Sequence, residues 1–321
     1  MPNAALLVSA PSRLHFGMFS FGVPTLRQFG GAGAMIDRPA LVLRIAPSTH
    51  WEYVGGPIER IRQAVDSVRA ADWGRDLSPV RIEVLFAPPA HTGLGTGTQT
   101  ALTVVAGLRH FYHLPRLAAA ELARAAGRAK RSAVGLYGFL HGGLIVEAGK
   151  LSHDVVAPLA AQVELPQAWR FVLVRPRAQE GLSGDSERAA FAGLPSVPQA
   201  LTDELCRIAL LDLVPSARSG DFAGFAEALY RFGHAAGRCF KSHQAGVYAT
   251  EQLATLVTRI RSAGVAGVGQ SSWGPTLYTL HPTAEAAQEF VMSCERWADA
   301  PRYDVVLAAP NRGGATFQFE A

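Results

Sequence analysis

The most constraining feature of the sequence is a change of hydrophobic pattern between residues 80 and 111. Residues 80–89 (VRIEVLFAPP) end in two prolines and have the composition of a strand, whereas apolar residues after Thr96 recur at helical spacing. The segment GLGTG lies between them. A loop of this kind exposes backbone N–H groups at the positive end of a helix, and glycine lets an anion approach closely. The stretch predicts either an anion-binding loop or a tight turn with a threonine cap.

The loop belongs to neither of the two commonest nucleotide-binding patterns. No lysine follows its second glycine, as the P-loop pattern GxxxxGK[ST] requires, and its spacing is not GxGxxG. Thr96 and Thr98 add hydroxyl groups to the backbone donors. Composition alone leaves anion binding and a plain turn equally open.

Composition excludes several classes of protein. The net charge of the 321 residues is +4, 27 of the 30 basic residues are arginine, and no five like charges are adjacent, so a basic nucleic-acid-binding tail is not predicted. The three cysteines are far apart and form no CxxC pair, which argues against a zinc or disulfide framework and favours a cytoplasmic protein. No apolar run reaches the length of a membrane span, and the first residues resemble a strand more than a signal peptide.

The order of expected elements predicts an α+β protein of two domains, residues 1–162 and 163–321. A linker is expected at 157–167 and a glycine-rich connector at 27–39. The expected strands are 4–19, 40–48, 80–89, 142–149, 170–177, 265–270, 276–280 and 303–310, and the expected helices are 96–114, 116–130, 198–213, 220–238, 249–263 and 283–298.

Two further stretches carry candidate site residues. In PSRLHFGMF (11–19), strand alternation places Arg13 and His15 on one face, which either meets an anionic substrate or is simply solvated. In GVGQSSWGPTLY (267–278), a polar loop between two strands contains Trp273, which either stacks on an aromatic ring or fills the core.

Metal binding is predicted at one place only. Asp185 and Glu187 lie in a glycine-serine loop before a helix, where carboxylates either hold Mg²⁺ or cap the helix. His110, His113 and His141 have no carboxylate or cysteine that would complete a ligand set.

Together these stretches resemble the GHMP kinase superfamily. Pro89 and Gly93–Thr96 match its second motif, PxxxGLGSS, and residues 267–275 (GVGQSSWGP) take the place of its third. The resemblance covers almost the whole chain. It implies an N-terminal lobe like domain 2 of ribosomal protein S5, a ferredoxin-like C-terminal lobe, and a site in the cleft between them.

Five motifs in order narrow the resemblance to the β-ribofuranosylaminobenzene 5′-phosphate synthase family. They are PSRLHFG (11–17), GLGTGTQ (93–99), GLYGFLHGG (135–143), GLSGDSERAAF (181–191) and GQSSWGPT (269–276). The family joins 4-aminobenzoate to phosphoribosyl pyrophosphate and releases CO₂ and pyrophosphate, an early step of methanopterin biosynthesis. The resemblance implies a cytoplasmic homodimer without nucleic-acid or membrane partners, and a 4-hydroxybenzoate acceptor fits the same description.

The resemblance also implies roles for particular residues. The diphosphate is expected on Gly93, Leu94, Gly95, Thr96, Gly97, Thr98 and Gln99, and Mg²⁺ on Asp185 and Glu187. Arg13 and His15 are expected to orient the carboxylate or the 5′-phosphate, and Ser271, Ser272 and Trp273 to form the wall around the ring.

The alternative is an ATP-dependent small-molecule kinase of the same fold. Such kinases carry an aspartate shortly before a Gly-Gly strand, but here Tyr137 and Phe139 stand in that region and no Asp or Glu lies between residues 122 and 146. A positioned base contributes about 10²–10⁴ in rate. Its absence argues against phosphorylation of a hydroxyl.

Overall fold

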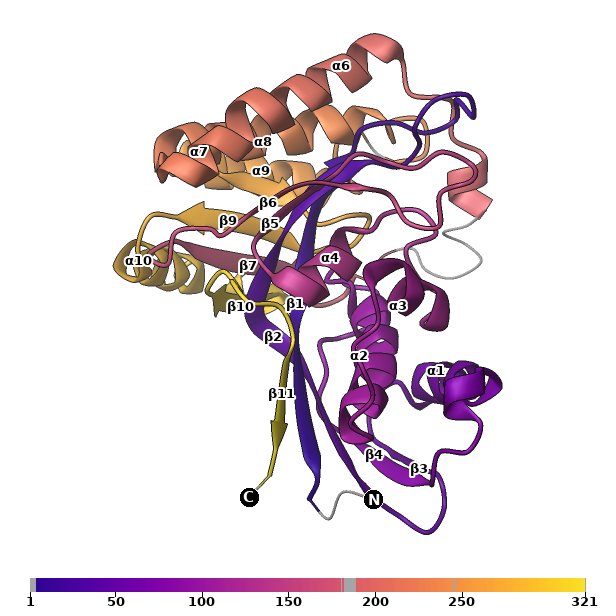
Figure 1. Ribbon diagram of the computed structural model, residues 1–321. Helices are drawn as coiled ribbons and strands as arrows, with labels where there is room; N and C mark the ends of the chain where they lie inside the picture. Colours follow the sequence, from indigo (N-terminus) through magenta and orange to yellow (C-terminus); the bar gives the residue numbers. More distant parts are fainter. Residues whose placement is uncertain (1–3, 180, 182–188, 245, 321) are drawn as a thin grey trace.

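The computed structural model describes residues 4–179, 181, 189–244 and 246–320 of the chain. Asp185 and Glu187, the residues expected to bind the metal, lie outside these ranges. The described elements form two lobes, each built on its own β-sheet, with helices packed between and around the sheets (Figure 1).

The N-terminal lobe contains a seven-stranded sheet in which β1 (Leu6–Met18) and β2 (Gly31–Pro47) are the long central pair. The main order is β11-β1-β2-β4-β3, with β5 paired to β2 and β6 to β5. The shorter strands are β3 (Glu52–Val54), β4 (Val80–Phe86), β5 (Leu144–Glu147), β6 (Leu159–Val163) and β11 (Thr316–Phe319). Among the strand pairs of this sheet in the described part of the chain, only β3–β4 is parallel.

Four helices cover one face of this sheet because their apolar stripes meet the inward residues of β1, β2 and β4. They are α1 (Ile58–Ala70), α2 (Thr96–Phe111), α3 (Ala119–Ala125) and α4 (Val134–His141). The core here contains Val8, Leu43, Leu102 and Val105, all fully or almost fully buried. A short 3₁₀ turn, Asp72–Gly74, follows α1.

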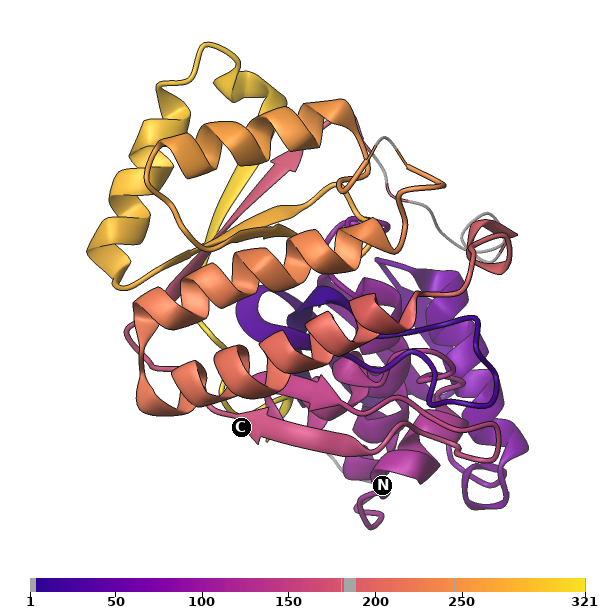
Figure 2. The ribbon, with the colours of Figure 1, turned by 90° about the horizontal axis from the view of Figure 1, so that it is seen from above.

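The C-terminal lobe has a four-stranded antiparallel sheet in the order β10-β7-β9-β8. Its strands are β7 (Arg170–Pro176), β8 (Val268–Gln270), β9 (Leu277–His281) and β10 (Tyr303–Ala308), and the 3₁₀ turn Ala300–Arg302 precedes β10. Helices α9 (Glu251–Ser262) and α10 (Ala284–Glu295) pack on one face (Figure 2).

The opposite face of that sheet packs on α8 (Phe222–Arg238), which also contacts β1 of the N-terminal lobe. Three further elements pack against α8: α6 (Gln199–Arg207), a π-helical turn at Ile208–Leu213 and α7 (Val214–Ser219). Phe225 and Phe232 of α8 share one hydrophobic cluster with Phe16 of β1 and Phe171 of β7. One continuous core therefore holds the two lobes together.

Two segments predicted to be connections between elements contain strands instead, so these two predictions are wrong. The glycine-rich stretch 27–39 enters β2 at Gly31, and the expected linker 157–167 contains β6. The glycines of β2 allow close packing on β1, since a Cβ on Gly31 would lie 2.3 Å from the carbonyl oxygen of Gly17 and one on Gly33 would lie 2.4 Å from that of Leu14. These glycines allow the backbones of β1 and β2 to pack closely, and they do not make the chain a flexible connector.

Within the described residues, no helix combines the length and the apolar character that crossing a bilayer requires. The domain boundary at 162/163 stays a prediction.

Candidate active site

The glycine loop runs from β4 into α2, as predicted. Gly95 is the N-cap of α2, with a left-handed φ of 74°. Its carbonyl oxygen accepts the N–H groups of Thr98 and Gln99, at 2.9 and 3.0 Å. The N–H groups of Thr96 and Gly97 belong to the first helical turn, where no intrahelical acceptor exists. These donors and the helix dipole make the loop suited to an anion.

The two threonines of the loop differ in their surroundings. The Thr96 hydroxyl is buried and donates to the carbonyl oxygen of Pro89 at 3.4 Å, so it stabilises the turn rather than facing solvent. Thr98 is half-buried. Of the two predicted hydroxyl donors, Thr98 is therefore the better placed for a ligand.

Arginines from three separate segments surround this loop. The Arg13 backbone N–H donates to the carbonyl oxygen of Leu94 at 3.0 Å, and its guanidinium lies against Gly95. Arg128 donates from Nη2 to the carbonyl oxygen of Gly97 at 2.7 Å. Arg60 Nη1 lies 2.7 Å from the place that a Cβ on Gly97 would occupy. The loop thus lies in a cationic environment that the spacing of its own residues did not reveal.

Ser271 joins the loop to β1 and to the turn before β9. Its hydroxyl donates to the carbonyl oxygen of Gly93 at 2.8 Å and accepts the backbone N–H of His15 at 3.0 Å. The Ser272 N–H donates to the carbonyl oxygen of His15 at 3.0 Å. The structure therefore brings together three of the predicted stretches, 11–17, 93–99 and 269–276.

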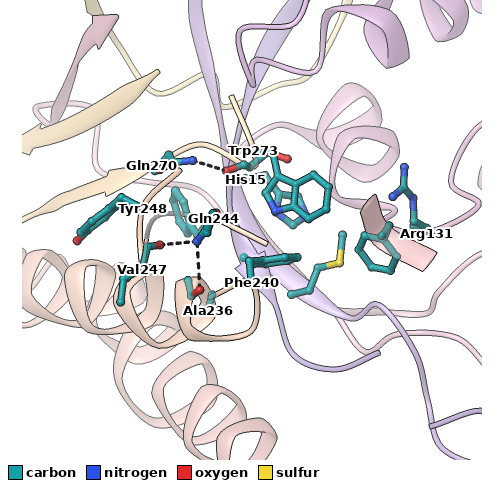
Figure 3. A pocket seen from close by; sticks show the side chains of 16 residues that line it. His15, Arg131, Ala236, Phe240, Gln244, Val247, Tyr248, Gln270 and Trp273 are labelled. Atoms are coloured by element: carbon teal, nitrogen blue, oxygen red, sulfur yellow. Dashed lines mark hydrogen bonds between the residues drawn. The ribbon is translucent and has the colours of Figure 1, made fainter. Parts of the chain in front are cut away.

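An aromatic pocket lies beside this junction (Figure 3). Trp273 and Phe240 meet edge to face with ring centroids 5.1 Å apart, and Phe191 lies 6.0 Å from Trp273. Arg131 also lines the pocket, with its guanidinium carbon 4.8 Å from the centroid of Phe191. Aromatic walls with a cation at the edge suit a flat aromatic anion.

His15 lines the same pocket and is almost completely buried, at 3% exposure. Burial, together with the nearby Arg13 charge, lowers the pKa of His15 well below its usual value. His15 is therefore neutral at pH 7, and the permanent charge of the predicted Arg13–His15 pair comes from Arg13. The expectation that this strand face is merely solvated is wrong for His15, because β1 lies between the N-terminal helices and α8.

A second buried group, Glu147, lies behind His15. His15 Nε2 is 3.0 Å from Ser132 Oγ, and Ser132 donates to Glu147 Oε1 at 2.6 Å. The Ala133 N–H donates to Glu147 Oε2 at 2.7 Å. Burial raises the pKa of Glu147 to about 7, although the hydrogen bonds from Ser132 and Ala133 oppose this shift.

The segment between residues 122 and 146, which contains no Asp or Glu, approaches the glycine loop at Gly135. Phe139 is buried in the N-terminal core, and the Tyr137 hydroxyl donates to the carbonyl oxygen of Ala157 at 2.8 Å. A Cβ on Gly135 would instead lie 3.3 Å from Thr98 Cγ2. The position next to the loop thus carries no side chain, and Gln99 donates to its carbonyl oxygen at 3.0 Å.

Sequence reasoning missed Arg131, Phe191, Phe240 and Glu147. Glu147 had a usable signal, because it is the one charged residue in the apolar strand LIVE (144–147). Phe191 ends the motif GLSGDSERAAF (181–191) but was given no role, and Phe240 had no signal, since nothing local distinguishes it from a core residue.

The described residues contain no group of three or more His, Cys, Asp or Glu side chains arranged to hold a metal ion. Magnesium on Asp185 and Glu187 stays a prediction.

Comparison with known proteins identifies the class of protein to which this fold and this site belong. The family model described as "GHMP kinases N terminal domain" matches residues 59–143, and "GHMP kinases C terminal" matches residues 213–296. Homoserine kinase from Cytophaga hutchinsonii superimposes with a TM-score of 0.68 at 16% identity, covering 99% of this chain and 98% of that one. Together the two matches span more than half of the sequence, and the chain belongs to the GHMP kinase superfamily.

Within that superfamily the chain is similar to curated proteins named β-ribofuranosylphenol 5′-phosphate synthase. The protein from Methanothermobacter thermautotrophicus is 28% identical, covering 86% of this chain and 88% of the relative. The protein from Archaeoglobus fulgidus is 29% identical, covering 86% and 87%. The predicted family resemblance, the two-lobed α+β fold and the expectation of an enzyme are confirmed.

Proposed function

We propose that the protein transfers the phosphoribosyl group of phosphoribosyl pyrophosphate to a 4-substituted benzoate, with release of pyrophosphate and CO₂. The observation that carries the proposal is the junction at Ser271. One hydroxyl group connects a cationic, helix-capping glycine loop to an aromatic pocket with an arginine at its edge. A diphosphate ester and an aromatic acid are the two ligand types that these surfaces suit.

In this proposal the glycine loop holds the leaving group. Negative charge grows on the diphosphate as its bond to ribose C1′ breaks, and donors that are already oriented stabilise such charge. The first-turn N–H groups, the Thr98 hydroxyl and the guanidinium of Arg60 supply them. Gly135, the residue beside the loop, has no side chain that could act as a base at this position, which supports a leaving diphosphate rather than a transferred phosphate.

The aromatic pocket holds the acceptor ring. Its carbon that bears the carboxylate forms a bond to ribose C1′, and loss of CO₂ then restores aromaticity. Arg131 orients the carboxylate, and Trp273 and Phe240 fix the ring plane. The acceptor comes from the predicted pair 4-aminobenzoate and 4-hydroxybenzoate, and the word "phenol" in the relatives' names favours the hydroxy acid.

Three further parts of the proposal come from the resemblance alone: methanopterin biosynthesis as the pathway, a cytoplasmic location and a homodimer. Mg²⁺ is proposed to arrive with phosphoribosyl pyrophosphate, since this ion is commonly held by substrate phosphates and few carboxylates. The described residues offer no ligand set for it, so no step is assigned to the ion.

A direct assay tests the proposal. Purified protein is incubated with Mg²⁺, phosphoribosyl pyrophosphate and each benzoate, and CO₂ and pyrophosphate are measured. Release of both products in equal amounts is expected. Absence of both above a no-enzyme control would refute the proposal, and ADP formation from ATP with a small alcohol would support the kinase alternative.

A further inference from the structure

Three polar groups lead from the aromatic pocket to the interior of the N-terminal lobe. His15 lines the pocket, Ser132 lies 3.0 Å from its Nε2, and Glu147 lies 2.6 Å beyond Ser132. Glu147 has no exposed surface. The groups therefore connect the imidazole ring of His15, at the pocket, to a carboxyl group that a ligand in the pocket does not contact directly.

The hydrogen-bond chemistry gives this chain two proton arrangements. When Glu147 is ionised it only accepts, so the Ser132 hydroxyl donates to it and the Nε2–H of His15 donates to Ser132. His15 Nδ1 then carries a lone pair, and no residue that the structure describes forms a hydrogen bond with that atom. When Glu147 is protonated both bonds reverse direction, and the proton of His15 sits on Nδ1.

We propose that His15, Ser132 and Glu147 form a proton relay that takes a proton from a substrate hydroxyl in the pocket and stores it on Glu147. The proposal rests on the proposed function and commits to a 4-hydroxybenzoate-type acceptor. It gives Glu147 a role that neither the motifs nor the loop geometry assigns to it.

The electrostatics of the two end groups suit such a relay. Burial and the Arg13 charge lower the pKa of His15, so His15 passes a proton on rather than holding a charge. Burial raises the pKa of Glu147 to about 7, so Glu147 gains and loses a proton near neutral pH.

The groups packed around Glu147 either favour its ionised form or carry no charge of their own. Arg13 from β1 favours the ionised carboxyl, and burial together with the charge of Glu147 raises the pKa of Tyr137 on α4. The backbone N–H groups of Ala133 and Val134 also stabilise the carboxylate. The residues opposite Glu147 on the flanking strands, Gly31 and Leu159, carry no charge.

The reaction balances with this relay. As the phenol proton moves to His15 Nδ1, the Nε2 proton moves to Ser132 and the Ser132 proton to Glu147. The ring carbon forms its bond to ribose C1′, and the C1′–O bond breaks with its electron pair going to pyrophosphate. The bond to the carboxylate then breaks, its electrons restore the ring, CO₂ leaves, and the proton returns to the phenol oxygen. An amino group needs no such transfer, because it carries the positive charge until CO₂ leaves.

The test compares wild type with Glu147→Gln on both acids. The amide that replaces the carboxyl must still accept the Ala133 N–H, so its N–H₂ group faces Ser132 and holds His15 as the Nδ1–H tautomer, which has no free base. The relay predicts a fall in kcat with 4-hydroxybenzoate on the order of 10²–10⁴, far larger than the fall with 4-aminobenzoate. An equal loss with both acids would show a merely structural role and overturn the relay.

The pH profile and the hydroxyl at position 132 give independent readouts. Wild-type kcat with 4-hydroxybenzoate is expected to fall as pH drops below about 7, where Glu147 is already protonated, and this limb should be missing with 4-aminobenzoate. Ser132→Ala should reproduce the selective loss and Ser132→Thr should restore most of it.

Nitrogen-15 NMR of the His15 ring supplies a readout that does not depend on turnover. At pH 8 the relay predicts the Nε2–H tautomer in wild type and the Nδ1–H tautomer in Glu147→Gln. The same tautomer in both proteins, or wild-type turnover of 4-aminobenzoate alone, would overturn the relay. Failure of wild type on both acids, with the tautomer shift present, would instead count against the proposed function.

Discussion

The glycine loop and the aromatic pocket meet at Ser271, but they are built in different ways. The loop uses backbone donors of one continuous segment, residues 93–99, and its geometry depends on glycines and on the start of α2. The pocket uses side chains that are distant in the sequence, among them His15, Phe191, Phe240 and Trp273. A site for a charged group can thus be formed by one short segment of sequence, whereas a site for a flat apolar group depends on residues that tertiary packing brings together.

The largest expected effect breaks the loop at its contact with the Ser271–Gly274 turn. In Gly93→Ala the new Cβ would lie 2.2 Å from the Ser271 carbonyl oxygen, at a φ of 86°. Overpacking and left-handed strain together cost the native loop conformation about 4 kcal/mol, so we expect the loop to move out of it and the affinity for phosphoribosyl pyrophosphate to fall by up to about a thousandfold. Calorimetric titration measures this loss. Gly264→Ala is the control, because Gly264 has the same φ and nothing within 4 Å of the new Cβ, and a similar loss there would contradict the crowding argument.

The next effect concerns Glu147, which lies behind His15 of the pocket, and appears as pH-dependent stability. Its folded pKa of about 7 lies above the usual carboxyl value of 4.5, so the folded protein binds the extra proton between these values. The stabilisation is complete below pH 4.5 and is lost as pH rises through 7, by roughly 3 kcal/mol at most. Urea unfolding at pH 5 and pH 8 should show this loss in wild type and not in Glu147→Gln.

The exposed Glu164 supplies the control for that measurement. Glu164→Gln should keep the wild-type difference between pH 5 and pH 8. If Glu147→Gln kept it too, the buried carboxyl would not be its source.

A smaller effect breaks the pocket and leaves the loop intact. Trp273→Leu removes the ring that meets Phe240 edge to face, and such pairs contribute about 0.5–1.5 kcal/mol beyond buried area. We expect KM for the benzoate to rise roughly tenfold, at about 1.4 kcal/mol, with unchanged affinity for phosphoribosyl pyrophosphate. Trp297→Leu, in the remote C-terminal core, should change thermal stability and leave this KM unchanged. Equal changes in affinity for both substrates would show that loop and pocket are not separate.

The smallest effect tests whether side-chain charge assists the loop. Arg60→Gln removes a cation beside Gly97, and a partly exposed charge of this kind contributes about 0.2–1 kcal/mol. Affinity for phosphoribosyl pyrophosphate should fall by about two- to fivefold at low salt and less at high salt. Arg62→Gln, on the same helix but paired with Glu59, should have no such effect. A loss that does not vary with salt would contradict a charge effect.

The parts of the fold that could be predicted from the sequence are those that depend on local pattern. The glycine loop, α2 and the strand-rich first half follow from periodicity and from proline and glycine placement. The first part of β2, residues 31–39, was missed because glycine usually weakens strands, whereas glycine here allows contact with Gly17 on another strand.

The site was only partly predictable for the same reason. Arg13, His15 and Ser271 belong to contiguous motifs, and the structure brings them together at the loop. Phe191 and Phe240 reach the pocket only through packing, and the position beside the loop turned out to be Gly135 rather than Tyr137 or Phe139. Side chains that act through tertiary neighbours leave little trace in a single sequence.

The pairing of β1 with β11 has a consequence for synthesis on the ribosome. Leu6–Ser9 hydrogen-bond with Thr316–Phe319, which are translated roughly 15–60 s later at typical elongation rates. During that interval one edge of β1 is open, with unpaired N–H and C=O groups that another strand can match. The N-terminal half of the nascent chain is therefore open to pairing with other strands during this interval, and loss of residues 316–319 would make that exposure permanent.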